Sequence, residues 1–346
     1  MDIFSLLITR PMGYIIEFVY TLIPNYGVAI ILFTLLIKAL LFPLNYKSQK
    51  SIIRQQRLQP LLQEIQTKYA NDKEKQSMET MRLYKENHVS MLGGCLPTLL
   101  QFPLIIGLYS VIRNPLTYVK NIDFQNTEMM DSAKVIINSF PESFKNMTAD
   151  MVVKNSQIPL AKAGEMLVQN PEKLAMLSDV SVNADQVMNV AGKFAIDFNF
   201  LGIDLSMVPS NIMSMFSGGE INWSLLSLLI IPALATFLTW FTSKLTKMMT
   251  PKKPDEKPKR VTGKEPEKKT GEGMMNAMNI MMPVTTLIFT FTLPSGIGLY
   301  WIMSSLVQIA QQFFMTKYLN KKDGGIIVGQ QQQEQSNGSK KKRKKR

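Results

Sequence analysis

Five apolar stretches alternate with charged segments along this chain. They run from Tyr26 to Leu44, Cys95 to Val111, Leu225 to Phe241, Met274 to Leu293 and Ile297 to Met315. Each is about 17–20 residues long, near the length of a helix that crosses a ~30 Å hydrocarbon core. Buried helices of soluble proteins look similar, but five such runs in one chain favour an all-α integral membrane protein. The pattern predicts a core of five spans.

The same pattern divides the chain into segments. We expect spans at 25–44, 93–113, 223–242, 274–293 and 297–315, with a cytoplasmic antiparallel helical hairpin at 45–92. A long acidic exterior loop at 114–222, read as a small helical cap, a flexible basic linker at 243–273 and a basic tail at 316–346 complete the chain. Residues 1–24 are apolar, but they carry Arg10, Pro11 and Glu17 and lack a clear cleavage site. We expect an amphipathic helix in the outer membrane interface, rather than a signal peptide or a sixth span.

Charge predicts the direction of the spans. Lys and Arg outnumber Asp and Glu by nine to five in 45–92, ten to five in 243–275 and ten to two in 316–346. In 114–222 the balance reverses, with seven basic against twelve acidic residues. Because loops rich in Lys and Arg stay in the cytoplasm, the predicted topology has the N-terminus outside and the C-terminus inside.

Lys38 is a cation inside an otherwise apolar span. A lysine at the centre of a membrane helix costs about 2.5–3.5 kcal/mol on insertion scales, so it often faces a wet cavity or a partner. Alternatively, Lys38 snorkels, since roughly 9 Å of helix separates it from the end of the span at Leu44. Gln101 is a second polar residue at depth, and an interhelical hydrogen bond is its plainer explanation. Tyr300 and Trp301 begin the last span, where aromatic residues are usually interface anchors.

The tail ends in seven consecutive basic residues. Such a run binds polyanions by neutralising phosphates and releasing counterions, which indicates ribosomal RNA or anionic lipid, although a purely topological signal is the alternative. The residues are Lys340, Lys341, Lys342, Arg343, Lys344, Lys345 and Arg346. Cys95 is the only cysteine, so no disulfide within the chain and no cysteine metal pair is expected. We expect no cofactor, no metal site and no catalytic residue, and no ATP motor because a phosphate-binding glycine loop of the P-loop type is missing.

Several sequence blocks stand out when they are taken together. They are LQPLLQEIQTKY, METMRLYKEN, LGGCLPTLLQFPLIIGLY, FLGIDLS and MMPVTTLIFTFTLPSGIGLYWIMSSLVQIAQQ. These blocks resemble the YidC insertase family, which includes mitochondrial and thylakoid homologues, and the resemblance implies a location in the cytoplasmic membrane of a bacterial cell. The resemblance covers about residues 22–113, 200–242 and 274–316. The LGGCLP…Q.P and P.G..LYW blocks, in order and at membrane spacing, are its most specific parts.

The resemblance implies a hydrophilic groove inside the five spans, open to the cytoplasm and to lipid and closed on the outer side. The groove's positive charge, usually an arginine in the family, falls on Lys38, and Thr34 shares its helix face one turn earlier. Gln101 matches the groove glutamine. Trp301 matches an aromatic that contacts nascent chains, with Phe289 across from it in the preceding span.

Three departures from the family pattern stand out. Lysine keeps the charge but lacks the planar fork that pairs with carboxylates in two hydrogen bonds. The exit of the hairpin reads Ser90–Met91 where the family commonly has Asn–Pro. The loop at 114–222 is much longer than is usual in bacteria with one membrane, and the large N-terminal exterior domain of bacteria with two membranes is not expected here. The role of this extra loop is left open, but its length does not affect the assignment of the five-span core to the family.

The predicted function is insertion of nascent membrane proteins into the bilayer without ATP, together with chaperoning of their folding. Lys38 would attract acidic segments into the groove, and apolar segments would then leave into lipid. The expected partners are nascent membrane proteins, the translating ribosome, membrane lipids and a Sec-type translocon. Two alternatives are a passive assembly chaperone and a small-solute transporter with Lys38 as counter-ion. The transporter would require inverted repeats, and five unequal spans do not divide into halves.

Overall fold

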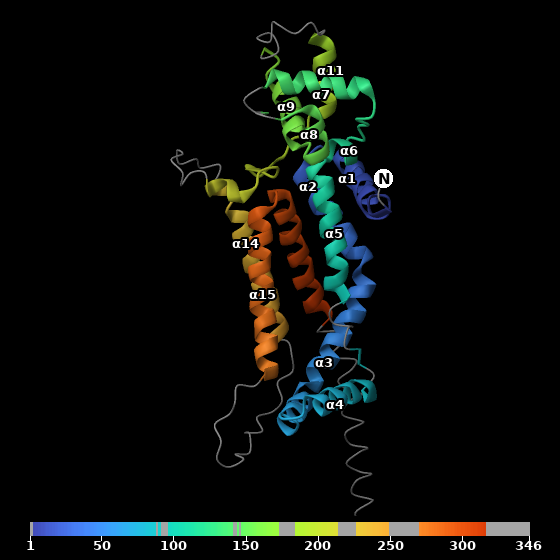
Figure 1. Cartoon of the computed structure of the whole chain (residues 1–346). Helices are drawn as coiled ribbons and strands as arrows, with labels where there is room; N and C mark the ends of the chain where they lie inside the picture. Colours follow the sequence, from blue (N-terminus) through green and yellow to red (C-terminus); the bar gives the residue numbers. More distant parts are fainter. Residues whose placement is uncertain are drawn as a thin grey trace, which may run out of the picture. The chain divides into compact units, whose positions relative to one another are not determined.

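The computed structural model describes residues 3–87, 89–90, 96–140, 144, 147–172, 184–213, 226–248 and 270–315. It is mostly helical, which confirms the all-α class (Figure 1). The chain forms two compact units. Unit 1 comprises Met1–Leu40, Thr98–Thr239 and Met281–Ser304, and unit 2 comprises Leu41–Pro97, Trp240–Ile280 and Ser305–Arg346.

Unit 1 begins with a π-helical turn, η1 (Ser5–Thr9), which continues into α1 (Arg10–Leu22) and α2 (Tyr26–Leu40). Met12 and Ile16 of α1 are buried, whereas Tyr14 and Phe18 are exposed, so α1 has one apolar face toward the protein and another away from it. Most of α5 (Leu96–Arg113) follows, and the unit also holds parts of α14 (Ile230–Met248), α15 (Thr270–Thr292) and a final helix, 295–315.

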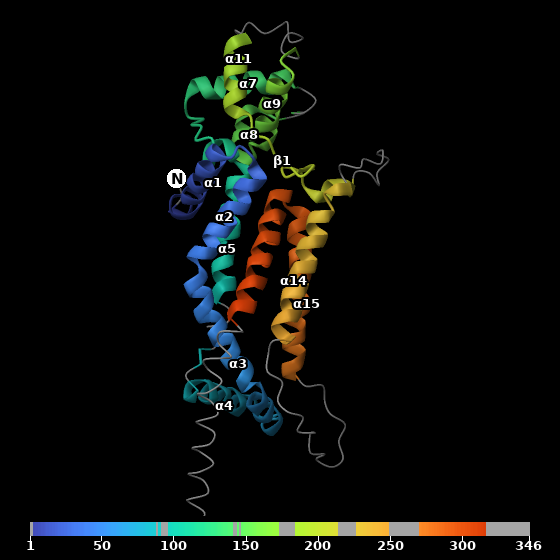
Figure 2. The ribbon, with the colours of Figure 1, turned by 180° about the vertical axis from the view of Figure 1, so that it is seen from behind.

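Between α5 and the short strands lies a group of short helices, here called the helical module. It consists of α6 (Pro115–Tyr118), α7 (Thr127–Ser139), α8 (Ala149–Asn155), α9 (Ile158–Gln169) and α11 (Ala184–Phe194), which lie together in both ribbon views (Figures 1 and 2). Side chains of Asn126 and Thr148 accept hydrogen bonds from the first turns of α7 and α8, which fixes where these helices begin. Helix α9 packs on α11 and α7. The sequence between α5 and α14 therefore builds its own small helical core.

Two short strands follow the module. Strand β1 (Asn199–Phe200) pairs antiparallel with β2 (Ile203–Asp204), and Phe200 lies opposite Ile203. The two turn residues have positive φ angles, 52° at Leu201 and 79° at Gly202, as a tight two-residue hairpin requires. The ring of Phe200 lies directly against Gly27, where a side chain would overlap it. This contact fixes the hairpin to the start of α2.

The link between α15 and the final helix is closely packed. A Cβ atom on Gly296 would lie 3.2 Å from Ile30 Cδ1 and 3.4 Å from Ile112 Cδ1. Ser295 and Ile297 are completely buried. Helices α2 and α5 therefore meet the final helix at this link. Gly296, which has no side chain, allows this close approach.

Unit 2 contains α3 (Phe42–Lys68) and α4 (Lys73–Glu86), which pack on each other after a turn. The Asp72 side chain accepts a hydrogen bond from the Lys75 amide, 3.0 Å away, and caps α4. Gln312 Oε1 accepts from Gln49 Nε2 and Thr246 Oγ1, each at 3.1 Å. One amide thus connects three helices in this unit.

Helices occupy all five ranges predicted as spans, with shifted ends. Helix α2 stops at Leu40 and α3 starts at Phe42, within the predicted span 25–44, because Pro43 has no N–H to continue the hydrogen-bond ladder. By length and hydropathy, no single helix among the described residues is sufficient to cross a bilayer. The two helical segments Tyr26–Leu40 and Phe42–Ile52, which are bent by 61° at their junction, together have the length and hydropathy of a span. Shorter apolar helices are present at Leu99–Arg113 and Ile280–Thr292. The five-span topology stays a prediction.

Some predicted features lie outside the described residues. These are Cys95, Met91 of the hairpin exit, the basic tail at 316–346 and most of the linker at 243–273. Where the linker is described, it is helical, since α14 continues to Met248 and α15 begins at Thr270.

Candidate functional site

The buried face of α2 changes character along its length. Ile30 and Phe33, near the link, are apolar and completely buried. Thr34 follows, also completely buried, and its hydroxyl donates to the Ile30 carbonyl at 2.6 Å. Lys38 comes one turn later and is only 8% exposed. Because residues four apart share a helix face, Thr34 and Lys38 form a continuous polar stripe, about 6 Å long, on the buried side of α2.

Lys38 has no ion-pair or hydrogen-bond partner within the described part of the chain. A buried charge without a partner costs several kcal/mol unless water or a ligand solvates it. A lysine that snorkels extends its ammonium group toward water and is therefore well exposed. Lys38 is only 8% exposed, which disfavours snorkelling. The charge of Lys38 is therefore not compensated by the described residues.

Gln101 and Tyr300 form a second polar element. Gln101 Nε2 donates to the Tyr300 hydroxyl at 2.5 Å, although the two residues lie 199 positions apart. Ser304, one turn farther along the final helix, also hydrogen-bonds to this hydroxyl. Tyr300 is only 2% exposed, which disfavours a role as an anchor at the membrane interface. This hydrogen bond connects α5 to the final helix. It agrees with the simpler explanation of Gln101, in which its side chain forms an interhelical hydrogen bond.

Phe289 and Trp301 form the third element. Their rings stack with centroids 6.1 Å apart and planes inclined by 19°. Phe289 belongs to α15 and is 37% exposed, and Trp301 is partly exposed on the final helix. The pair presents an accessible aromatic surface rather than a buried core contact.

The six predicted residues all belong to unit 1, but they do not form one bonded cluster. Among the described residues, no hydrogen bond or ion pair joins Lys38 or Thr34 to the other four. Three residues that the sequence reasoning missed add to the polar interior: Thr286, Thr290 and Ser304 are nearly buried. The spacing of Thr286 and Thr290 by four positions in an apolar helix was the available signal.

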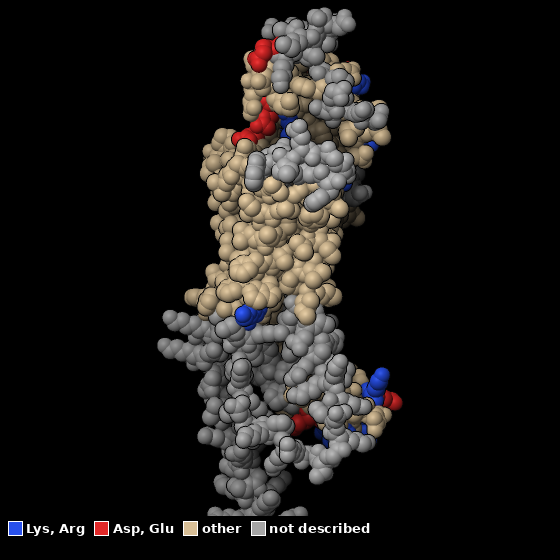
Figure 3. Space-filling model, turned by 90° about the vertical axis from the view of Figure 1, so that its left-hand side faces the viewer, with Lys and Arg blue, Asp and Glu red and all other residues tan. Residues whose placement is uncertain are grey.

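Along two helices, the buried residues change from apolar to polar with increasing distance from the link. On α2 they are Ile30, Thr34 and Lys38, and on the final helix they are Ile297, Tyr300 and Ser304. Residues 98–112 of α5 and the unit 1 parts of α14 and α15 contain no acidic or basic residue, and Figure 3 shows a broad surface without such residues. These helices of unit 1 are therefore uncharged outside, and their interior becomes more polar with distance from the link.

No group of three His, Cys, Asp or Glu side chains could hold a metal ion anywhere in the part of the chain that the structure describes. The candidate site consists of one cation, hydroxyl and amide groups, and an aromatic pair. Such groups can attract, hydrogen-bond and stack on a polypeptide, which suits binding of a passing chain.

Comparison with known proteins adds sequence evidence. The family model described as "60Kd inner membrane protein" matches residues 18–322 of the chain. A protein named "Membrane protein insertase YidC" from Nitratidesulfovibrio vulgaris is 47% identical over 107 residues, 31% of this chain and 20% of that protein.

Proteins of the same name show similar matches in other bacteria. The one from Brucella suis is 48% identical over 105 residues, 30% of this chain and 17% of its own length. The one from Anaeromyxobacter dehalogenans is 33% identical over 163 residues, 43% of this chain and 30% of its own length. The chain thus matches between 17% and 30% of the length of these relatives.

Proposed function

The chain belongs to the 60Kd inner membrane protein family, the family of the YidC insertases, and from this membership we propose that it inserts other proteins into the lipid bilayer. Its substrates are nascent membrane proteins, and it resides in the bacterial cytoplasmic membrane as five spans, with the N-terminus outside. The segments rich in Lys and Arg at 45–92, 243–275 and 316–346 support this orientation.

The observation that carries the proposal is Lys38, which is buried and has no ion-pair or hydrogen-bond partner among the described residues. Moving a substrate's acidic tail across a bilayer is costly because each carboxylate loses its hydration. A polar groove lined by Thr34, Lys38 and Gln101 shortens the dry distance, and the ammonium of Lys38 compensates the carboxylate charge during passage. The apolar segment of the substrate then moves into lipid, which is favourable without ATP. The stacked Phe289 and Trp301 offer this segment an aromatic surface.

The test compares substrates that differ only in tail charge. In cells depleted of the protein, translocation of a short single-span substrate with an acidic exterior tail is followed with wild type, Lys38→Ala and Lys38→Arg. An attraction of about 1.5–3 kcal/mol, typical of hydrogen bonds to charged groups, predicts that Lys38→Ala slows translocation roughly 10–100-fold, while Lys38→Arg retains it. A substrate with a neutral tail is the control and should be nearly unaffected.

The results separate the mechanism from its rivals. Full activity of Lys38→Ala on the acidic tail would rule out the role of the charge. Failure of wild type to restore any translocation, with folding of an already inserted protein restored, would favour the passive assembly chaperone instead.

We further propose that the seven basic residues at the end of the tail hold the translating ribosome, and that a Sec-type translocon assists with larger substrates. Removal of residues 338–346 should weaken co-sedimentation with ribosomes and reduce its dependence on salt, because fewer counterions are released. Removal of residues 329–337, nine residues without a basic side chain, is the matched control. Equal binding by the two deletions would rule out the tail's role.

A further inference from the structure

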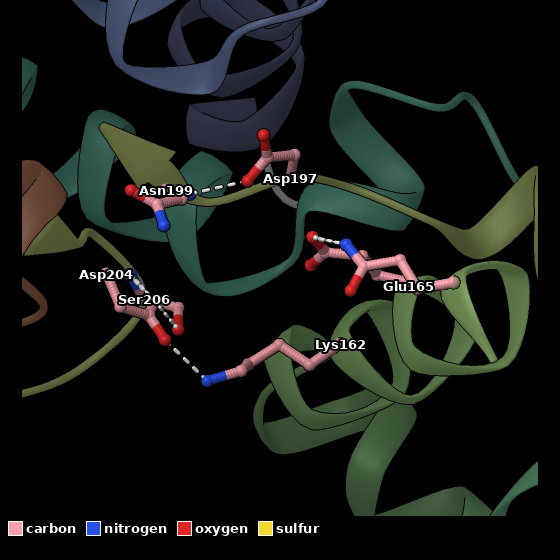
Figure 4. Close-up of polar contacts among 7 residues, drawn as sticks. Lys162, Glu165, Asp197, Asn199, Asp204 and Ser206 are labelled. Carbon is pink, nitrogen blue, oxygen red and sulfur yellow. Dashed lines mark hydrogen bonds and ion pairs between the residues drawn. The ribbon is translucent and has the colours of Figure 1, made fainter. Parts of the chain in front are cut away.

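An ion pair joins the helical module to the strand that follows it. Lys162 Nζ of α9 lies 2.6 Å from Asp204 Oδ2 in β2, and both side chains are about two-thirds covered. The other carboxylate oxygen accepts from the Ser206 amide at 2.9 Å and from its hydroxyl at 2.5 Å (Figure 4). Burial raises the pKa of Asp204, but the hydrogen bonds from Lys162 and Ser206 lower it by more. Asp204 is therefore ionised at neutral pH and uses both oxygens.

The residues next to Asp204 cap the final helix. The Gly296 amide donates to the Leu205 carbonyl and the Ser295 amide donates to the Met207 carbonyl, each at 2.9 Å. Amides in the first turn of a helix lack acceptors within that helix. Here a segment from elsewhere in the chain supplies them. The position of residues 204–207 thus determines how firmly the link between α15 and the final helix is held.

The start of α9 is fixed to α5. Gln157, which precedes α9, is only 2% exposed. Its amide donates to the Arg113 carbonyl at 2.9 Å, at the last residue of α5. Its side chain accepts from the Thr117 amide at 2.9 Å and donates to the Thr117 hydroxyl at 2.8 Å. Helix α9 therefore connects the end of α5 at Gln157 and the Asp204 segment at Lys162, about one and a half turns apart.

We propose that α9 is a strut that keeps the outer end of the insertase closed, with Lys162 and Asp204 as its positioning residues. The strut holds residues 205 and 207 against the link at 293–296, so that this end stays sealed while a substrate occupies the polar interior. The idea rests on the proposed insertase function, and it gives the long exterior loop a role: limiting ion leakage during insertion.

The first experiment measures the strut directly, without a substrate. Full-length protein in lipid nanodiscs is analysed by hydrogen exchange of peptides that cover 293–299. In Lys162→Met and in Asp204→Asn, the amides of this segment should exchange roughly two- to fivefold faster than in wild type, the scale of one partly exposed charged pair. Lys162→Arg, which keeps the pair, should remain within twofold of wild type.

The control breaks a comparable pair within the same module. Lys134 Nζ lies 2.7 Å from Asp131 Oδ1, three residues away on α7. This pair has no connection to the link, so Lys134→Met should leave exchange at 293–299 unchanged. Unchanged exchange in both Lys162→Met and Asp204→Asn, or an equal increase in Lys134→Met, would overturn the strut.

The second experiment measures sealing in proteoliposomes that contain an ion-sensitive dye, with and without an inserting substrate. We expect Lys162→Met to insert the substrate within twofold of wild type but to leak several-fold more ions during insertion. Faster exchange with wild-type leakage would overturn the sealing role. If wild type itself inserts nothing, the proposed function fails, whereas the exchange experiment still decides whether the strut exists.

Discussion

Gly298 is a point at which a single methyl group should disturb the packing of unit 1. A Cβ atom on this residue would overlap Ile231 Cγ2 of α14, and it would lie 3.7 Å from Ile231 Cβ and 3.9 Å from Thr290 Cβ. Ile231 is 4% exposed and branched at Cβ, so its methyl group cannot rotate away freely. Gly298→Ala therefore separates α14 from the final helix or forces a strained rotamer.

The expected magnitude follows from two opposing effects. Overpacking of a close-packed core costs typically 1–3 kcal/mol. Replacing glycine by alanine within a helix returns about 0.8–1 kcal/mol. The net loss should be roughly 1–2 kcal/mol of unfolding free energy. For chains of this size range, a loss of 1 kcal/mol lowers the melting temperature by about 2–4 °C, so we expect a decrease of roughly 2–8 °C in detergent.

The matched control is Gly192→Ala in α11, where no heavy atom lies within 4 Å of the new Cβ. This variant should be neutral or slightly more stable. In the double variant with Ile231→Ala, the methyl group at residue 298 should fill part of the cavity, so the two effects should not add. Equal melting temperatures for Gly298→Ala and Gly192→Ala, or strict additivity with Ile231→Ala, would refute the packing argument.

Three further predictions concern single side chains. Lys38→Met should raise the unfolding free energy by roughly 1–3 kcal/mol, because the uncharged side chain avoids part of the cost of a charge in a membrane helix; equal or lower thermal stability in detergent would contradict this. Leu201→Asn should stabilise the strand hairpin by up to about 1 kcal/mol, because Leu201 is 87% exposed at a positive φ that asparagine tolerates better; a lower melting temperature would argue against it. Burial, together with Asp197 and Asp204, raises the pKa of Glu165, so the stability from its bound proton is lost as pH rises through that pKa. Glu165→Gln should therefore stabilise the protein more at pH 7 than at pH 4, and the same effect at both values would count against it.

The sequence was sufficient for features that depend on local spacing. The four-residue spacing of Thr34 and Lys38 predicts a shared helix face, and both are buried on it. The short connection Leu293–Gly296 predicts a tight link between two helices, and the helices end and begin there. Periodicity and turn residues report such features because neighbours in sequence determine them.

The sequence could not reveal contacts between distant segments. Lys162 and Asp204 lie 42 positions apart, in a loop whose only predicted structure was a helical cap, and no spacing rule pairs them. Gln101 and Tyr300 were each candidates, but their hydrogen bond spans 199 positions. Such pairs depend on how the helices pack, and many residues could satisfy the same local pattern.

The capping of the final helix also sets an order of assembly. Leu205 and Met207, which accept from the amides of residues 296 and 295, are synthesised about 90 residues earlier. Their carbonyls and the side chains of Ile30 and Ile112 must wait for the last hairpin to arrive. A chain that stalls on the ribosome before residue 293 therefore exposes this apolar surface, and the protein completes the packing around residues 295–297 only as its synthesis finishes.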